Sequence, residues 1–249
     1  MAWVEEGAGL TGLANVCSPL VTDNRHDHFI APAAWLQSPV GLGRAAVAGL
    51  GVAIAADLFA LGAGLYVRDV SDDLANGALR DGRVELADRL YSAAGIAQTV
   101  VLLTTAVLFL CWFHRVRVNA EVFDPYGHEK KRGWVVWGWL LPIVNLWFPR
   151  RMTVDIWNAS SPWSAPRTHG LVNTWWTFWV ISLLSGRAAS SAYRKAESPD
   201  EIHDAVGQLM FSDLIDVVAA ALAIAVVLRL NRMQYEKALA GPGPVPVSA

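Results

Sequence analysis

Three aspartates, Asp57, Asp213 and Asp216, lie inside long apolar stretches, where an ionisable side chain is costly unless it is paired or functional. Asp213 and Asp216 are three residues apart and therefore share a helix face. Such residues either line an ion or proton pathway or form hydrogen bonds between helices, and the second role is common in small membrane domains. Arg187, at a similar expected depth in the preceding apolar stretch, is the predicted ion-pair partner of Asp213.

Other residue types that could carry chemistry form no convincing set. His26 and His28 flank Asp27, but two imidazoles and a carboxylate without a further ligand nearby are weak evidence, and we expect no metal site. Cys17 and Cys111 are too few for a disulfide framework. The sequence contains no catalytic triad motif, CxxC, HExxH or Gly-rich phosphate loop. We therefore expect neither an enzyme nor a cofactor.

The composition is typical of an integral membrane protein. Hydrophobic residues make up 54% of the 249 residues and charged residues only 17%, below the roughly 25% of soluble domains. This composition predicts an all-α, polytopic helical membrane protein whose main partner is the lipid bilayer. The formal net charge of -2 lacks the basic excess of a nucleic-acid-binding protein, so we expect no nucleic-acid partner.

The apolar stretches predict four transmembrane helices, at residues 45–67, 91–113, 173–191 and 209–228. The acidic segments 68–90 and 192–208 between them are expected to be loops. Trp175, Trp176 and Trp179 are expected to anchor the third helix at the membrane interface.

The segments around these helices define the expected domains. Residues 1–43 are interrupted by prolines and lack the pattern of a signal peptide, so we expect a soluble or surface-lying arm. Residues 44–235 form the multi-span membrane domain. Residues 236–249 end in a Gly- and Pro-rich run and are expected to be a disordered tail.

The stretch 134–149 is apolar but broken. As a helix its 16 uncharged residues would reach only ~24 Å, short of the ~30 Å hydrocarbon core. Pro142 disfavours helix in the residue before it, and Asn145 adds an amide that needs a partner away from water. The length is marginal for a full crossing, and a Trp/Pro-rich hairpin, re-entrant or interfacial, fits these features as well as a crossing does.

The residues after the broken stretch bear on topology. The segment 150–160 is amphipathic, with Met152, Ile156 and Trp157 on one side, and is expected to lie along the membrane interface. Lys and Arg residues gather before the broken stretch, after it and after the last predicted span. If the broken stretch does not cross, the positive-inside rule places both termini in the cytoplasm.

Four segments carry a resemblance to a known family: FLCWFHRVRVNAEVF (109–123), WGWLLPIVNLWFP (137–149), IWNAS (156–160) and NTWWTFWVISLL (173–184). The most specific spacing is that of Trp139, Pro142, Asn145, Leu146 and Pro149. These segments resemble the actinobacterial membrane family known as domain of unknown function 4328. The resemblance implies a multi-span membrane domain over roughly residues 44–235 and, because that family has no established activity, almost nothing about chemistry.

Two functions remain open. The parts outside the membrane are too short for a catalytic domain, which favours a non-enzymatic scaffold or interaction protein of the cell envelope that binds other membrane proteins or itself. The alternative is a small transporter, channel or proton-coupled sensor in which Asp57 and Asp216 meet Asn145 at the break. Discontinuous segments at membrane depth tend to bind substrates or ions, which favours the alternative.

Overall fold

Helices make up nearly all of the described chain. The computed structural model describes residues 36–78, 82–162 and 168–241, all within one compact unit. These residues form six α-helices and a short 3-10 helix, with no strand among them, so the all-α prediction is confirmed. Cys17 and the segment containing His26, Asp27 and His28 lie outside the described residues.

Three helices are long and apolar enough to cross a membrane: α1 (Val40–Ala75), α2 (Arg83–Phe123) and α6 (Pro199–Ala240). Their 36 to 42 residues correspond to ~54–63 Å, about twice the hydrocarbon thickness. Large apolar side chains on α1 and α2 face outward, among them Leu65 and Ile96, which are 61% and 66% exposed. A continuous apolar exterior suits lipid better than water.

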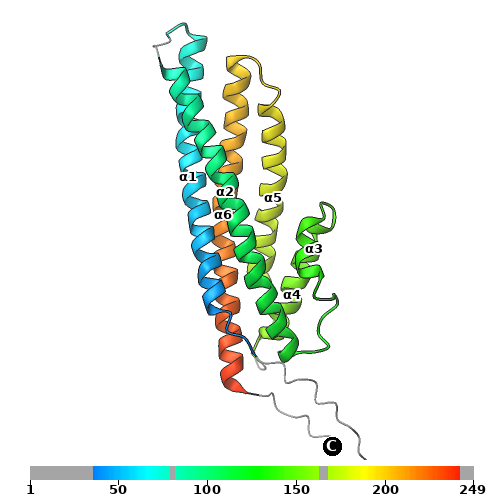
Figure 1. The fold of residues 1–249 in the computed structure, drawn as a ribbon. Coiled ribbons are helices and arrows are strands. Elements are labelled where there is room, and N and C mark those ends of the chain that lie inside the picture. The colour runs from blue at the N-terminus through cyan, green and yellow to red at the C-terminus, as the bar shows by residue number, and fades with distance from the viewer. Residues whose placement is uncertain (1–35, 79–81, 163–167, 242–249) are drawn as a thin grey trace, which may run out of the picture. The chain divides into compact units, whose positions relative to one another are not determined.

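A fourth helix, α5 (Gly170–Tyr193), completes a bundle with these three (Figure 1). α6 packs against both α1 and α5, and α1 packs against α2. α1 and α5 run in one direction, whereas α2 and α6 run in the other (Figure 1). We call the end with the α1–α2 and α5–α6 connections the loop end, and the end at which α6 stops the hairpin end.

The broken stretch folds into two short helices and a turn. α3 (Trp134–Leu140) stops where Leu141 becomes extended, with φ -82° and ψ 117°, directly before Pro142. A 3-10 turn (Val144–Leu146) and α4 (Phe148–Ser160) follow. α3 and α4 pack on each other, and the chain returns to the hairpin end, so we call this unit the α3–α4 hairpin (Figure 1). The predicted break at Pro142 is confirmed.

α4 has the amphipathic pattern expected of residues 150–160. Met152, Ile156 and Trp157 are all buried on one side of it. Pro149 occupies the first turn, where its missing N–H costs no hydrogen bond. The helix therefore contributes its apolar side to the core at the hairpin end.

The acidic segment 68–90 is mostly helical, so the loop prediction for it was wrong. Val67, Val70 and Ala87 are buried against Val206, which shows an apolar stripe continuing past the uncharged part of each helix. The charges lie on the other faces and pair between helices. Arg83 binds Asp69 at 2.5 Å and also binds Asp73.

The second acidic segment, 192–208, is also helical in its latter half. α6 begins at Pro199 because the Ser198 side chain accepts a hydrogen bond from the backbone N–H of Glu201, and the Glu201 carboxylate accepts one from the backbone N–H of Ser198. The segment is acidic because carboxylates are favourable in the first turn of a helix. Asp200 and Glu201 lie in that first turn and therefore indicate the start of a helix. The prediction of a loop through these residues was wrong.

α6 also continues to Ala240, into the segment 236–249 expected to be disordered. Lys237 is buried and donates hydrogen bonds to the carbonyl oxygens of Ala159 and Ser161, at 2.7 and 3.0 Å. These two carbonyls end α4 and have no intrahelical donor. The lysine therefore joins the end of α6 to the end of α4.

The core at the hairpin end is aromatic. Trp139 lies in the middle, with ring centroids 5.5 to 6.3 Å from those of its neighbours, which are Phe109, Phe113, Trp175, Trp176 and Trp179. Trp175 and Trp176 are only 2% and 6% exposed. The prediction that they are interface anchors is therefore wrong: they hold the α3–α4 hairpin against α2 and α5.

Candidate functional site

One glutamine side chain connects two of the three aspartates within the bundle. Gln98 of α2 donates through Nε2 to Asp57 Oδ1 of α1 at 2.9 Å and to Asp213 Oδ1 of α6 at 3.0 Å. All three side chains are half-buried. A single amide group therefore joins three helices at a point well inside their apolar lengths.

The third aspartate connects α6 to α5. Asp216 accepts a hydrogen bond from the hydroxyl of Ser182. One turn toward the loop end, Ser185 Oγ lies 3.2 Å from Ser212 Oγ. Ser182 and Ser212 are both buried. We call Asp57, Gln98, Ser182, Asp213 and Asp216 the carboxylate cluster.

Small residues bring the helices close enough for these contacts. A Cβ on Gly64 of α1 would lie 2.9 Å from Met210 Cγ of α6, and one on Gly186 of α5 would lie 3.2 Å from Ser212 Oγ. Ala60 is also buried on the same side of α1. Small residues at helix contacts allow the backbones to approach and short polar side chains to reach across.

The carboxylate cluster contains no positive charge. None of its three aspartates takes part in an ion pair with any residue that the structure describes. The predicted pair of Arg187 with Asp213 is not formed, because Arg187 is exposed and Asp213 is bonded to Gln98 instead. Across the described ranges, no group of three or more His, Cys, Asp or Glu side chains could hold a metal ion.

Asn145 lies apart from the cluster. Its Nδ2 donates to the carbonyl oxygen of Trp139 at 3.2 Å, which closes the turn of the α3–α4 hairpin. Trp176 Nε1 of α5 donates to the carbonyl oxygen of Leu146 at 3.2 Å and fixes the same turn from outside. The expected contact of Asn145 with Asp57 and Asp216 is therefore not formed. Asn145 instead stabilises the turn of the hairpin.

The polar residues of the hairpin turn lie in a region that matches a known family. The model of a family described as a domain of unknown function, DUF4328, matches residues 75–232, more than half of the chain. The chain belongs to this family. No curated protein and no solved structure matches the chain. An actinobacterial source stays a prediction.

The DUF4328 region contains four of the five cluster residues. Gln98, Ser182, Asp213 and Asp216 lie within residues 75–232, whereas Asp57 lies on α1, before the matched region. Gln98 and Ser182 were not singled out in the sequence. Gln98 could have been identified because it is a lone glutamine in an otherwise apolar run. Ser182 could not, because a serine in a helix is too common to be informative.

A second polar region, also missed in the sequence, lies at the hairpin end. Asn119 of α2 binds both backbone groups of Gln37, at 2.9 and 2.7 Å, and donates to Gln234 Oε1 of α6 at 3.0 Å. Gln234 in turn donates to the carbonyl oxygen of Val116 and to Ser160 Oγ of α4, at 2.8 and 3.1 Å. These buried bonds fix α2, α4 and α6 to one another.

Arg117, next to this network, is only 2% exposed and lies near His128 and Asp155. It donates to the carbonyl oxygen of Lys130 at 2.5 Å, but its Nη1 and both ring nitrogens of His128 have no hydrogen-bond partner among the described residues. Burial lowers the pKa of His128, and the charge of Arg117 lowers it further. Burial raises the pKa of Asp155. Arg117 is paired with Glu121 at 3.3 Å, and burial favours the neutral forms of His128 and Asp155 beside this pair.

Proposed function

We propose that this protein is a multi-pass membrane protein that binds protons at the carboxylate cluster and functions as a small proton-coupled transporter or sensor. The observation that carries the proposal is the contact of Gln98 with both Asp57 and Asp213 inside the bundle, where none of the described basic side chains forms an ion pair with either carboxylate. Carboxylates that share a site within an apolar layer cannot all be ionised. Their charge is removed by a proton or by another cation.

A proton fits the geometry better than a metal ion does. The described residues offer no group of three acidic or other metal-ligating side chains for a metal. The contacts of the cluster are single hydrogen bonds from an amide and a hydroxyl. A hydroxyl both donates and accepts, so Ser182 can bond Asp216 in its ionised or its protonated form. The protein keeps the same partners in both states.

The proposal includes a topology with four crossings. α5 packs along α6 and exposes large apolar side chains, among them Ile181 and Leu184, at 42% and 53%. These features support a fourth transmembrane helix beside α1, α2 and α6. The α3–α4 hairpin then enters from the hairpin end and returns to it. Exposed apolar residues at its turn, including Leu140 and Ile143, support insertion into lipid.

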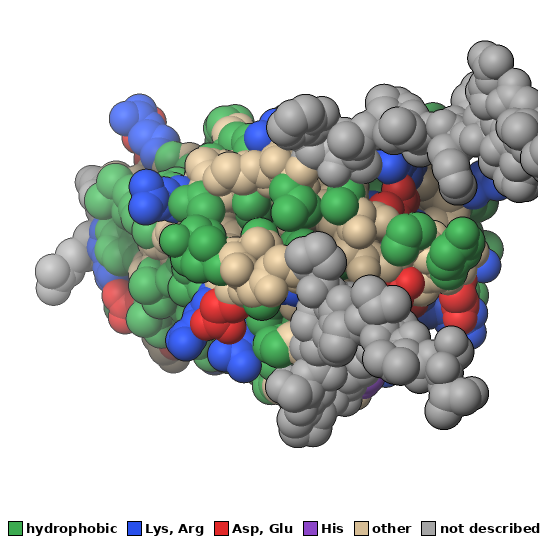
Figure 2. All heavy atoms as spheres, turned by 90° about the horizontal axis from the view of Figure 1, so that it is seen from below, with side chains coloured by type: hydrophobic (Ala, Val, Ile, Leu, Met, Phe, Trp, Pro, Cys, Tyr) green, Lys and Arg blue, Asp and Glu red, His purple; other side chains and the backbone are tan. Residues whose placement is uncertain are grey.

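The proposed orientation places the hairpin end and both termini in the cytoplasm of the cell membrane. Lys and Arg side chains lie around the hairpin end (Figure 2). Those described there include Lys130, Arg132, Arg151 and Arg232. At the loop end acidic residues outnumber basic ones over residues 68–78, 82–90 and 192–208, and Asp72 and Asp200 are among them. This asymmetry supports the orientation through the positive-inside rule.

Proton flux into liposomes tests the function. Purified protein in liposomes that contain a pH-sensitive dye should acidify the interior when a pH gradient is imposed. Asp216→Asn and Gln98→Met should each reduce the rate strongly, because they remove a protonation site and a shared donor. Asp88→Asn, an exposed acid on α2 outside the cluster, is the matched control and should leave the rate unchanged.

The flux result also decides between this proposal and a scaffold. Flux above that of empty liposomes but equal in Asp216→Asn and the control would remove the cluster from the mechanism. No flux, together with specific co-purification of another membrane protein, would favour a scaffold or self-associating protein of the cell envelope. The absence of enzymatic activity and of a nucleic-acid partner also remains part of the proposal.

Cysteine labelling in intact cells tests the topology. In a background without native cysteines, Ala78→Cys at the loop end should react with an impermeant thiol reagent. Tyr126→Cys and Thr168→Cys, before and after the hairpin, should both be protected. All three positions are exposed in the structure. Protection of residue 126 combined with labelling of residue 168 would show that the hairpin crosses the membrane.

A further inference from the structure

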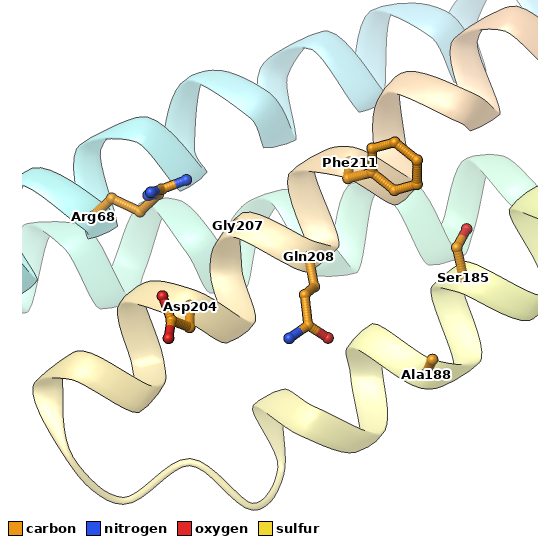
Figure 3. A pocket seen from close by; sticks show the side chains of 7 residues that line it. All are labelled: Arg68, Ser185, Ala188, Asp204, Gly207, Gln208 and Phe211. Carbon is orange, nitrogen blue, oxygen red and sulfur yellow. The ribbon is translucent and has the colours of Figure 1, made fainter.

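A pocket of about 540 Å³ lies between α1, α5 and α6 on the loop-end side of the carboxylate cluster. Arg68 of α1 and Asp204 of α6 line it nearest the α5–α6 connection, and Ser185 of α5 lies farthest from it (Figure 3). Gln208 extends from α6 toward α5 between them (Figure 3). The volume is many times the ~30 Å³ of one water in the liquid. Its walls are mixed: Ala188 and Phe211 are apolar, and the polar side chains of Arg68, Asp204 and Gln208 offer hydrogen-bond partners to water.

Charged groups surround the mouth of this pocket. Arg68 Nε donates to His203 Nε2 at 3.1 Å, and His203 Nδ1 lies 2.9 Å from Asp72 Oδ1. Gly207 gives Arg68 room to lie against α6, since a Cβ there would be 2.9 Å from Arg68 Nη1. Together with Asp204, these groups give the mouth both signs of charge, which keeps it hydrated.

The inner wall of the pocket is one hydroxyl away from the cluster. Ser185 Oγ lines the pocket and lies 3.2 Å from Ser212 Oγ and 3.1 Å from the carbonyl oxygen of Ser182. The hydroxyl of Ser182 donates to Asp216. Ser212 and Asp216 are four residues apart, on one face of α6. The hydroxyl groups of Ser185, Ser212 and Ser182 therefore lie close together between the pocket and Asp216.

We propose that this pocket is the aqueous entrance of the carboxylate cluster, through which water delivers protons from the loop end to Asp216. The inference rests on the proposed function and adds the route. Hydroxyl groups can accept a proton on one side and release one on the other, so Ser185, Ser212 and Ser182 are suited to this step. In each transfer a hydronium ion gives one proton to the carboxylate and leaves a neutral water.

Thiol reactivity tests whether the pocket holds water. In a background with Cys17 and Cys111 replaced by serine, Ser185→Cys should react with a charged, impermeant thiosulfonate added on the loop-end side. Leu184→Cys, its neighbour on the apolar face of α5, is the matched control and should react only with a lipophilic maleimide. Equal rates of reaction with the charged reagent at both positions would overturn the inference.

Carbodiimide labelling tests the connection to Asp216 without relying on flux. A water-soluble carbodiimide with an amine should label Asp216, as read by mass spectrometry, and prior modification of Ser185→Cys should reduce that labelling several-fold. Modification of Leu184→Cys should not reduce it. Unchanged labelling after the pocket is filled would exclude it as the entrance.

The two proposals can fail separately. Flux that depends on Asp216 but is unaffected by filling the pocket would overturn the entrance and leave the proposed function intact. Labelling of Asp216 that is blocked by filling the pocket, in a protein whose flux does not depend on Asp216, would support the entrance and refute the proposed function.

Discussion

Replacing Gln98 by methionine isolates the contribution of the shared amide donor. Methionine has a similar length and volume but no N–H group, so the change removes the bonds of 2.9 and 3.0 Å to Asp57 and Asp213 with little change in packing. Hydrogen bonds between membrane helices contribute ~0.6 kcal/mol on average and up to ~1.7 kcal/mol, so losing two should lower the free energy of unfolding by about 1–3 kcal/mol.

The size of this loss should depend on pH. Removing the donor should lower the free energy of unfolding more when the carboxylate is charged than when it is protonated. An unpaired charge in an apolar layer is costly, whereas a protonated carboxyl group is neutral. Unfolding in mixed micelles by a titrated detergent, at about pH 5 and about pH 8, should therefore show a larger difference between wild type and Gln98→Met at the higher pH. Gln208→Met, at an exposed glutamine on α6, is the control.

Two results would refute the reasoning. A loss no larger than that of Gln208→Met would mean that the amide does not join the helices. A clear loss of equal size at both pH values would mean that Gln98 contributes to packing but does not respond to the charge of Asp57 and Asp213. The second result would also weaken the proposed protonation of the cluster.

Three further changes test other parts of the structure. Gly64→Ala should lower the melting temperature in detergent because its methyl group would contact α6, whereas Gly62→Ala, with open space around it, should not. Burial lowers the pKa of His128 in the folded state, so the stability of the wild type should fall as the pH drops below the ordinary histidine pKa of ~6.5. Thermal melts of His128→Gln from about pH 7 to pH 5 should show a smaller fall. Combining Pro142→Leu with Asn145→Leu should extend α3 through the break and move the segment after the hairpin to the opposite side, as read by cysteine labelling; an unchanged side in a folded protein would contradict this.

The break in the chain was predictable because its cause is local. Pro142 constrains Leu141 whatever surrounds it, and α3 ends at Leu140, directly before that residue. The amphipathic pattern of α4 was readable for the same reason, since Met152 and Ile156 recur at helical spacing. Features that depend on a few neighbouring residues can be read from the sequence.

The contacts between helices were less predictable because they depend on how each helix is rotated. Arg187 and Asp213 were paired by depth alone, but depth does not say which way a side chain points, and Arg187 is exposed. Asp57 and Asp213 were identified as unusual, yet their common partner Gln98 is uncharged and did not stand out. The tryptophans were misread in a similar way, because a ring near the end of a helix can lie in the interface or, as Trp175 does, in the core.

α6 is one uninterrupted helix of 42 residues, and this continuity has a mechanical consequence. It lines the pocket near its beginning, carries Asp213 and Asp216 along its length and reaches Gln234 and Lys237 near its end. After Pro199 it contains no proline that would allow a kink. An intact helix is stiff along its axis and moves as a rigid body. If α6 rotates or shifts at Asp213 or Asp216, its far end therefore rotates or shifts by the same amount. The bonds of Gln234 and Lys237 to α2 and α4 would therefore register events that take place ~30 Å away.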